Sequence, residues 1–201
     1  KGHPEHYQDL AAKIVSETPG SFFSDQFNNP SNPYIHETTT GPEIWEQMNG
    51  DIDAFVAGVG TGGTISGVGK FLKSKNSELK LVVADPEGSV VADAVNKGSF
   101  KYENGSWLVE GIGEDHIPGN LNLDIIDEGI YVSDKKAFEM LNKLLQEEGI
   151  LAGTSCGTLL EAAVEWCKLQ KEPKKVVTLI CDTGNKYLSK AYNKDWVKEN
   201  L

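Results

Sequence analysis

The sequence predicts an α/β protein in which a parallel β-sheet is covered by helices on both faces. One observation behind this prediction is that helical and extended hydrophobic patterns alternate along the chain. Another is that two glycine-rich segments, 58–64 and 153–158, each stand at the beginning of a helical pattern. In parallel sheets ligands gather beyond the C-terminal ends of the strands, so both segments are expected at that edge.

The first half of the chain supplies three helical and three extended patterns. Apolar residues recur at helical spacing in the opening segment, and Pro42 stands in the first turn of the second helix, where its missing N–H does no harm. Short apolar runs bounded by polar or glycine residues predict the strands. The expected helices are 7–17, 41–49 and 65–75, and the expected strands are 21–24, 54–57 and 79–84.

The second half continues this alternation after a segment rich in glycine and asparagine, which is expected to be mostly irregular. Ser133 is expected to cap a helix that Gly149 ends, because serine favours the first position of a helix and glycine the position after its end. The expected elements are the irregular segment 96–119, a strand over 125–132, helices over 139–148 and from 153 to about 171, and a buried strand over 176–181.

Composition and charge exclude several classes of protein. The 201 residues are 39% hydrophobic and 24% charged, as in ordinary water-soluble domains. No apolar run approaches the roughly 20 residues that cross a bilayer, and the polar start resembles no signal peptide, so a cytoplasmic protein is expected. The net charge of −11 repels nucleic acids and anionic membranes. Every basic residue is a lysine, so an anionic ligand must be held without a guanidinium group.

Cysteines and histidines give no metal-binding pattern, and no metal is expected. Cys156, Cys167 and Cys181 are an odd number at spacings that match neither zinc nor redox motifs, so reduced thiols are expected. We expect Cys167 and Cys181 in or near the core. The four histidines are not spaced as a ligand set and are expected in loops or at the surface; they are His3, His6, His36 and His116.

The segment Gly58–Thr64 is the most informative part of the sequence. It follows the apolar run 54–57 and leads into the helix expected over 65–75. Glycines allow a tight turn, while unpaired N–H groups at the start of the helix, together with its dipole, attract negative charge. Thr61 and Thr64 add hydroxyl donors at the same place. A ligand that carries a phosphate group is therefore expected here.

Three interpretations of this loop remain open at this point. The spacing of Gly58, Gly60 and Gly63 matches the dinucleotide fingerprint, and Asp85 follows near the position of a ribose-binding acid. However, that fingerprint usually lies on the first strand of its domain. Two threonines suit a terminal monophosphate better than a pyrophosphate, so a ligand with a single phosphate group is the second interpretation. The third interpretation is a tight turn that binds nothing.

Further motifs stand in order along the rest of the chain. Together they resemble the cysteine synthase and cystathionine β-synthase family, whose members are fold-type II pyridoxal-phosphate enzymes. The similarity spans nearly the whole chain and is more specific than one glycine loop. The matching segments are 25–33, 36–45, 60–64, 85–89, 110–113, 117–118 and 153–155.

The resemblance implies pyridoxal 5′-phosphate as the cofactor and a role for several residues. Gly60, Thr61, Gly62, Gly63 and Thr64 would hold its phosphate. Ser155 would hydrogen-bond the pyridine nitrogen, where a neutral hydroxyl weakens the ring as an electron sink and favours β-elimination over transamination. Gln26 would bind the carboxylate of the amino-acid substrate. Gly111, Gly113 and Glu114 would line the substrate pocket. From the residues alone, a helix cap would be the favoured role for Ser155, and a loop residue with backbone hydrogen bonds the favoured role for Gln26.

The resemblance also implies that this chain is only part of a catalytic unit. The Schiff-base lysine of the family, and the loop that binds the substrate carboxylate with Gln26, lie upstream of the matching segment, so the chain is expected to need that N-terminal part. Residues of about 1–30 would complete a smaller N-terminal subdomain, and about 31–201 would form the larger, cofactor-binding subdomain. A homodimer is implied as well.

The choice between the family's activities is less direct. The run 36–45 resembles cysteine synthases, which make cysteine from O-acetylserine and sulfide. The segments 85–89 and 110–115 resemble cystathionine β-synthases, which join serine to homocysteine in transsulfuration, and we favour this activity. Glu114 departs from the tyrosine of the animal enzymes, which puts the second substrate in doubt. A catalytically silent relative that only binds a partner remains an alternative of another class.

Overall fold

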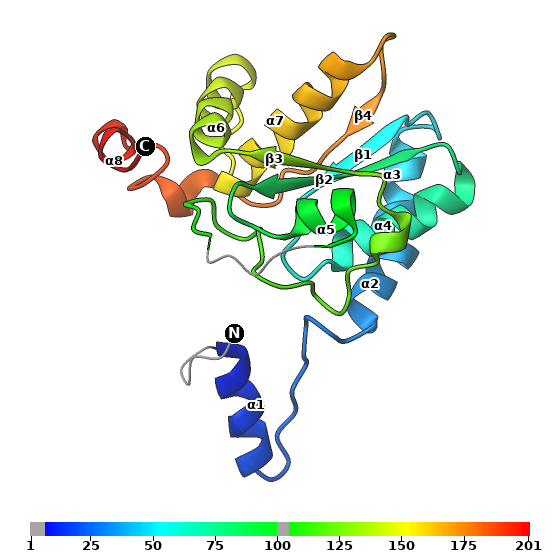
Figure 1. Ribbon diagram of the computed structural model, residues 1–201, viewed down its shortest axis with the longest axis vertical. Coiled ribbons are helices and arrows are strands. Elements are labelled where there is room, and N and C mark those ends of the chain that lie inside the picture. The colour runs from blue at the N-terminus through cyan, green and yellow to red at the C-terminus, as the bar shows by residue number, and fades with distance from the viewer. Residues whose placement is uncertain (1–6, 100–104) are drawn as a thin grey trace.

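The computed structural model describes residues 7–99 and 105–201 and has the predicted α/β architecture. Its centre is a four-stranded parallel sheet of order β3-β2-β1-β4 (Figure 1). The strands are β1 Ala54–Ala57, β2 Lys80–Pro86, β3 Glu128–Val132 and β4 Val176–Val177. The fold class expected from the alternating patterns is thus confirmed.

Helices cover both faces of the sheet. The covering helices are α3 Gly41–Gln47, α4 Gly63–Lys75, α5 Val91–Lys97, α6 Asp134–Glu148 and α7 Thr154–Leu169. Helices α6 and α7 lie on one face, whereas α4 and α5 lie on the other (Figure 1). Alternate residues of β1 point to opposite faces: Val56 packs in the α6–α7 cluster and Phe55 in the α3–α4 cluster. Both are fully buried, so the strand is apolar throughout.

A continuous helical segment packs against α4 and was predicted only at its end. It consists of α2 Ser31–Ile35, a π-helical stretch His36–Thr40, and α3. The remaining elements are α1 Tyr7–Glu17, α8 Lys194–Asn200 and two short 3-10 helices, Leu123–Ile125 and Gly184–Tyr187. Helix α1 lies apart from the sheet (Figure 1), and none of its residues is buried. The expected boundary near residue 30 stays a prediction.

Three of the predicted strands were wrong in whole or in part. The strand expected over 125–132 begins only at Glu128, because a 3-10 helix covers Leu123–Ile125. The segment 21–24 forms no strand, and Phe22 is 83% exposed, because no strand of the described chain lies beside it to complete a ladder. The strand expected over 176–181 pairs only at Val176 and Val177. Beyond them the Thr178 hydroxyl donates to the Val56 carbonyl at 2.9 Å, so a side chain takes the place of the ladder's N–H donor.

Helix ends and loops were predicted more accurately than the short strands. The Ser133 side chain accepts from the Lys136 N–H, and Gly149 ends α6 with φ 70°, as expected. Helix α5 was not predicted; it follows β2 directly and is too short to show a clear period. The described part of the segment 96–119 is irregular apart from the last turn of α5.

Asp85, at the end of β2, is expected to make stability fall as pH rises. Its carboxylate is fully buried and accepts from the Ala92 N–H at 2.8 Å, but its other oxygen has no partner among the described residues. Burial raises the pKa of Asp85 from 3.8 to about 6. The folded protein therefore holds a proton that the unfolded chain releases between about pH 4 and 6, so stability is lost across that window, by on the order of 2–3 kcal/mol.

Urea unfolding of the complete protein between pH 4 and 8 tests this expectation. The Asp85→Asn variant should lack this contribution, and so should gain stability relative to the unchanged protein as pH rises through the window. Asp93→Asn is the matched control on α5: a hydrogen bond from Lys97 lowers the pKa of that half-buried carboxyl, so this variant should not gain stability relative to the unchanged protein as pH rises. Equal pH profiles for Asp85→Asn and the unchanged protein would contradict the assignment.

Candidate active site

A cleft of about 640 Å³ opens at the C-terminal ends of β1 and β4. The glycine-rich loop after β1 forms one side, the segment from Trp107 to Glu114 forms another, and the start of α7 forms the floor. This is the edge at which the parallel sheet was expected to collect ligands. Of the predicted site residues, the cleft brings together Gln26, Gly60, Thr61, Gly62, Thr64, Gly111, Gly113, Glu114 and Ser155.

The glycine-rich loop leaves its backbone donors free for a ligand. Within the described chain, the N–H groups of Thr61, Gly62 and Thr64 donate to no other residue. Gly62 has φ 79°, a left-handed conformation that favours glycine, and it directly precedes α4. The loop therefore presents unpaired N–H groups at the positive end of a 13-residue helix, which is the arrangement of an anion site.

Gly63, the remaining predicted residue of the loop, lies behind the cleft rather than in its wall. It is buried against α2, and a Cβ atom there would meet the Asn32 Oδ1 at 1.9 Å. Its role in the structure is therefore to let α2 approach the start of α4 closely.

Two side chains from the α2 segment fix the threonine hydroxyls, and sequence reasoning missed both. The Asn32 Nδ2 donates to the Thr61 Oγ1 at 2.9 Å. The His36 Nε2 lies 3.3 Å from the Thr64 Oγ1, and its Nδ1 lies 2.9 Å from the Thr40 Oγ1. Because Asn32 must donate, the Thr61 hydroxyl keeps its own hydrogen for a ligand. The sequence signal that could have revealed these contacts is the spacing of the polar residues Asn32, His36 and Thr40, which are four residues apart and so share one helical face.

Burial lowers the pKa of His36, so its ring is neutral at pH 7. A neutral imidazole has one donor and one acceptor nitrogen. The tautomer that donates from Nε2 and accepts from Thr40 leaves the Thr64 hydroxyl hydrogen free as well. Both threonines can then act as donors toward an anion in the loop.

Ser155 lies on the floor of the cleft, as the second residue of α7, and is 5% exposed. It lines the same cleft as the glycine-rich loop and is not the cap of the helix, because Gly153 holds that position. Asp182 lies beside this floor: its carbonyl accepts from the Gly153 N–H at 3.0 Å and its carboxylate accepts from the Tyr187 hydroxyl at 2.9 Å. Burial raises the pKa of Tyr187 to about 12, so the phenol stays protonated.

The wall from Trp107 to Glu114 is irregular but firmly attached. The Gly113 N–H donates to the Val59 carbonyl at 2.8 Å, which ties the wall to the loop after β1. The Asp134 carboxylate accepts from the N–H groups of Leu108 and Val109 at 2.9 and 3.1 Å, which ties it to α6. The Glu110 N–H donates to the Thr154 Oγ1 at 2.9 Å, which ties it to α7. These contacts fix Gly111 and Gly113 in the cleft wall.

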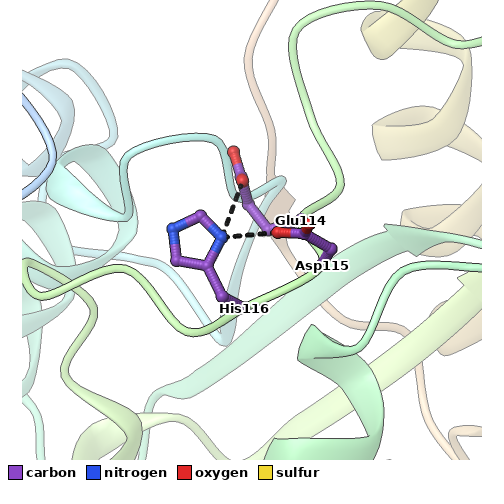
Figure 2. Close-up of side chains that lie close together, drawn as sticks. All are labelled: Glu114, Asp115 and His116. Atoms are coloured by element: carbon purple, nitrogen blue, oxygen red, sulfur yellow. Dashed lines mark hydrogen bonds and ion pairs between the residues drawn. The ribbon is translucent and has the colours of Figure 1, made fainter. Parts of the chain in front are cut away.

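Glu114 lies beside a histidine at the rim of the cleft (Figure 2). The His116 Nδ1 lies 2.7 Å from the Asp115 Oδ1 and 3.6 Å from the Glu114 Oε2. The ligand-type atoms of these three consecutive residues lie within 4.8 Å of one another. The ring nitrogen hydrogen-bonds with the Asp115 carboxylate and lies within ion-pair distance of the Glu114 carboxylate.

The Gln26 side chain is exposed and lines the cleft opposite this wall. Its backbone is held in place, because its carbonyl accepts from the side-chain amides of Asn32 and Asn120 at 2.7 and 2.8 Å. The side-chain amide itself has no hydrogen-bond partner among the described residues. It is therefore free to bind a ligand in the cleft.

The cysteines differ from their expected placement. Cys156 is buried, but Cys167 and Cys181 are both exposed, so the expectation that these two lie in the core was wrong. Cys167 lies on the outer side of α7, and Cys181 follows the short strand β4 and lines the cleft. The histidines were expected in loops or at the surface. This is confirmed for His116, which lies in an irregular segment, but was wrong for His36, which is half-buried in a helical stretch; His3 and His6 fall outside the described residues. No helix of the described residues has the length and apolar character to cross a membrane.

The sheet is parallel, and a glycine-rich loop and the start of a helix line one cleft at its C-terminal edge, as in many cofactor-binding α/β enzymes. The chain belongs to the pyridoxal-phosphate dependent enzyme family, whose model matches residues 1–182. It is 45% identical to a cysteine synthase of Staphylococcus aureus (strain Mu50 / ATCC 700699) over 179 residues, which cover 89% of this chain and 56% of that protein.

Two further relatives represent both activities. A cystathionine beta-synthase of Dictyostelium discoideum is 38% identical over 197 residues, covering 98% of this chain and 39% of that protein. Cysteine synthase A of Salmonella typhi is 39% identical over 197 residues, covering 94% of this chain and 59% of that protein. The chain thus spans about half the length of the curated relatives it matches.

The cleft fits the cofactor of this family. Its loop supplies free N–H groups and two hydroxyls, a donor set that suits the many acceptor oxygens of a monophosphate. The volume of about 640 Å³ is in the range of small-molecule sites. Within this chain, which has no arginine, the groups suited to hold a phosphate in this loop are these neutral donors and the helix dipole.

Proposed function

We propose that the complete protein uses pyridoxal phosphate to replace the β-hydroxyl of serine with the sulfur of homocysteine, giving cystathionine. The observation that carries this proposal is that Ser155 and the glycine-rich loop line one and the same cleft. When bound, the cofactor supplies an electron sink for chemistry at the substrate's α and β carbons. The relatives named cystathionine beta-synthase and cysteine synthase support this type of chemistry.

Each cleft residue then has a defined task. The N–H groups of Thr61, Gly62 and Thr64, with the two threonine hydroxyls, would anchor the phosphate, and Gly60 and Gly63 would shape the loop around it. The Ser155 hydroxyl hydrogen-bonds the ring nitrogen as a neutral partner, which leaves that nitrogen less protonated. The free amide of Gln26 binds the substrate carboxylate, and Glu114, at the rim with Gly111 and Gly113, meets the amino group of the incoming thiol substrate.

The lysine that binds the cofactor covalently belongs, in this proposal, to a part of the protein outside residues 1–201. Supporting this, no described residue that lines the cleft is a lysine. The wider proposal includes a homodimer in the cytoplasm, in which the remaining N-terminal part completes the cleft beside Gln26.

Cysteine synthase is the second candidate function. The relative with 45% identity carries that name, and the segment 36–45 resembles that activity. Steady-state kinetics of the complete protein separates the two, comparing kcat/KM for serine plus homocysteine with kcat/KM for O-acetylserine plus sulfide. A clear preference for the second pair would overturn the proposed substrates. A complete protein that shows no visible absorbance from bound cofactor would favour the silent, partner-binding alternative.

Replacing Ser155 with alanine is expected to lower kcat by about tenfold or more, because a hydrogen bond to a partly charged group contributes roughly 1.5–3 kcal/mol. Binding of the phosphate should be retained, because the glycine-rich loop is unchanged. The measurement is kcat, together with an absorbance titration with pyridoxal phosphate. Ser74→Ala, on the exposed end of α4, is the control and should change neither quantity. Unchanged turnover in Ser155→Ala would remove Ser155 from the mechanism.

A further inference from the structure

The side chain of Ser89 holds the backbone of Glu114 at the rim of the cleft. The Glu114 N–H donates to the Ser89 Oγ at 3.0 Å, and the Ser89 hydroxyl donates to the Glu114 carbonyl at 3.1 Å. The Val90 N–H donates to the same carbonyl at 3.0 Å. One hydroxyl therefore pairs with both backbone groups of Glu114, because it can donate and accept at the same time.

The Ser89 hydroxyl is itself fixed in place. Ser89 is 5% exposed and lies in the short connection between β2 and α5, where its N–H donates to the Pro86 carbonyl at 3.1 Å. Pro86 is the last residue of β2, and Val90 is the cap residue at the start of α5. The hydroxyl is thus positioned by the end of a buried strand, in surroundings where water cannot readily take its place.

The backbone beside Glu114 is tied to the same strand, so only the Glu114 side chain remains adjustable. A Cβ at Gly113 would meet the Pro86 Cγ at 2.5 Å, so Gly113 packs directly on the end of β2. The Glu114 Oε2 lies 3.6 Å from the His116 Nδ1 (Figure 2). Glu114 therefore projects its carboxylate at the rim from a backbone that is held on both sides.

We propose that Ser89 is a positioning residue for the second substrate, because it holds Glu114 where the carboxylate meets that substrate's amino group. The inference rests on the proposed function, in which Glu114 has this task. Ser89 is not among the described residues that line the cleft, so its hydroxyl acts on a substrate only through Glu114. Alanine at position 89 would remove both hydrogen bonds of the hydroxyl and leave the Val90 N–H on the Glu114 carbonyl.

The test is steady-state kinetics of Ser89→Ala in the complete protein. We expect the KM for homocysteine to rise about fivefold or more, the effect of losing one net hydrogen bond. The KM for serine and kcat should stay within about twofold, because the glycine-rich loop, Gln26 and Ser155 are unchanged. Equal increases in the two KM values, or a fall in kcat alone, would overturn the positioning role.

Ser66→Ala is the matched control. Ser66 is also 5% exposed, and its Oγ accepts from the Asn122 N–H at 2.9 Å, so the variant likewise loses a hydrogen bond between a buried hydroxyl and the backbone. That bond lies away from the rim. Ser66→Ala should therefore leave the KM for homocysteine unchanged, and an increase equal to that of Ser89→Ala would show that the effect is not specific to Glu114.

A double-mutant cycle tests whether Ser89 acts through Glu114. In the Glu114→Gln background, Ser89→Ala should raise the KM for homocysteine no further, because both changes affect the same carboxylate. Additive increases would overturn the proposal.

Hydrogen exchange separates a failure of this inference from a failure of the proposed function, because it needs no substrate. The amides of the segment 107–116 should exchange faster in Ser89→Ala than in the unchanged protein or in Ser66→Ala. Unchanged exchange would show that Ser89 does not hold the rim. Faster exchange in a protein that prefers sulfide to homocysteine would overturn the proposed substrates and leave the hold on Glu114 supported.

Discussion

Replacing Gly62 with alanine is expected to weaken the binding of pyridoxal phosphate by the complete protein at least about tenfold. The residue has φ 79°, and an added Cβ would meet the Leu121 Cβ at 2.8 Å and its backbone N at 2.9 Å. A left-handed alanine costs about 1–2 kcal/mol, and the contacts with Leu121 prevent the loop from simply accepting it. The N–H groups beside it would then turn away from the phosphate. The measurement is an absorbance or fluorescence titration with the cofactor.

Gly149→Ala is the matched control for this experiment. Gly149 has a similar φ of 70° at the end of α6, but an added Cβ would meet nothing within 4 Å. Gly149→Ala should lower the free energy of unfolding, because it introduces a similar backbone strain, but it should leave the affinity for the cofactor unchanged. An unchanged affinity in Gly62→Ala would argue against an anion site in this loop, whatever ligand the cleft takes.

The largest effect on stability is expected from Gly157→Ala, at the contact between α6 and α7. A Cβ at this position would lie 2.1 Å from the backbone oxygen of Ala137 and 2.9 Å from the Leu141 Cγ. Alanine is favoured over glycine in a helix by about 1 kcal/mol, but overpacking a core costs about 1–3 kcal/mol or more. Because the added Cβ would meet backbone atoms, the two helices must separate. The cost of overpacking therefore exceeds the gain in helix propensity, and the substitution is expected to destabilise the protein.

We expect Gly157→Ala to lower the free energy of unfolding of the complete protein by at least about 2 kcal/mol, measured by urea denaturation. Lys168→Ala, at an exposed position of the same helix, is the control and should stay within about 0.5 kcal/mol of the unchanged protein. A stabilised Gly157→Ala variant would mean that α6 and α7 are not in such close contact.

The sequence predicted the parts of the fold that local chemistry determines. Glycine-rich turns, the serine cap of α6 and the apolar strands β1 and β2 all carry signals within a few residues. The segment 21–24 and the end of the 176–181 run have the composition of strands, but a strand forms only where a partner offers its hydrogen bonds. Whether a partner is present depends on distant parts of the chain, which a single local pattern cannot show.

The candidate site likewise has features that the sequence predicted and features that it could not predict. Ser155 and the glycine-rich loop could be expected in one cleft, because both follow the general rule for the edge of a parallel sheet. The supporting roles of Asn32 and His36 could not be predicted from the sequence, because they depend on how closely α2 packs on α4. Cys181 was expected in the core on account of the apolar run before it. It lies in the cleft because the chain leaves the sheet after Val177.

The attachment of the Trp107–Glu114 wall decides how this enzyme can enclose a substrate. Its hydrogen bonds to Val59, Asp134 and Thr154 join it to the loop after β1 and to two helices of the same face, so wall and floor move as one body. The cleft also takes in Gln26, from the connection between α1 and α2. Because the Gln26 carbonyl accepts from the side chains of Asn32 and Asn120, that part of the cleft is tied to the rest as well, and the cleft is preorganised for a ligand.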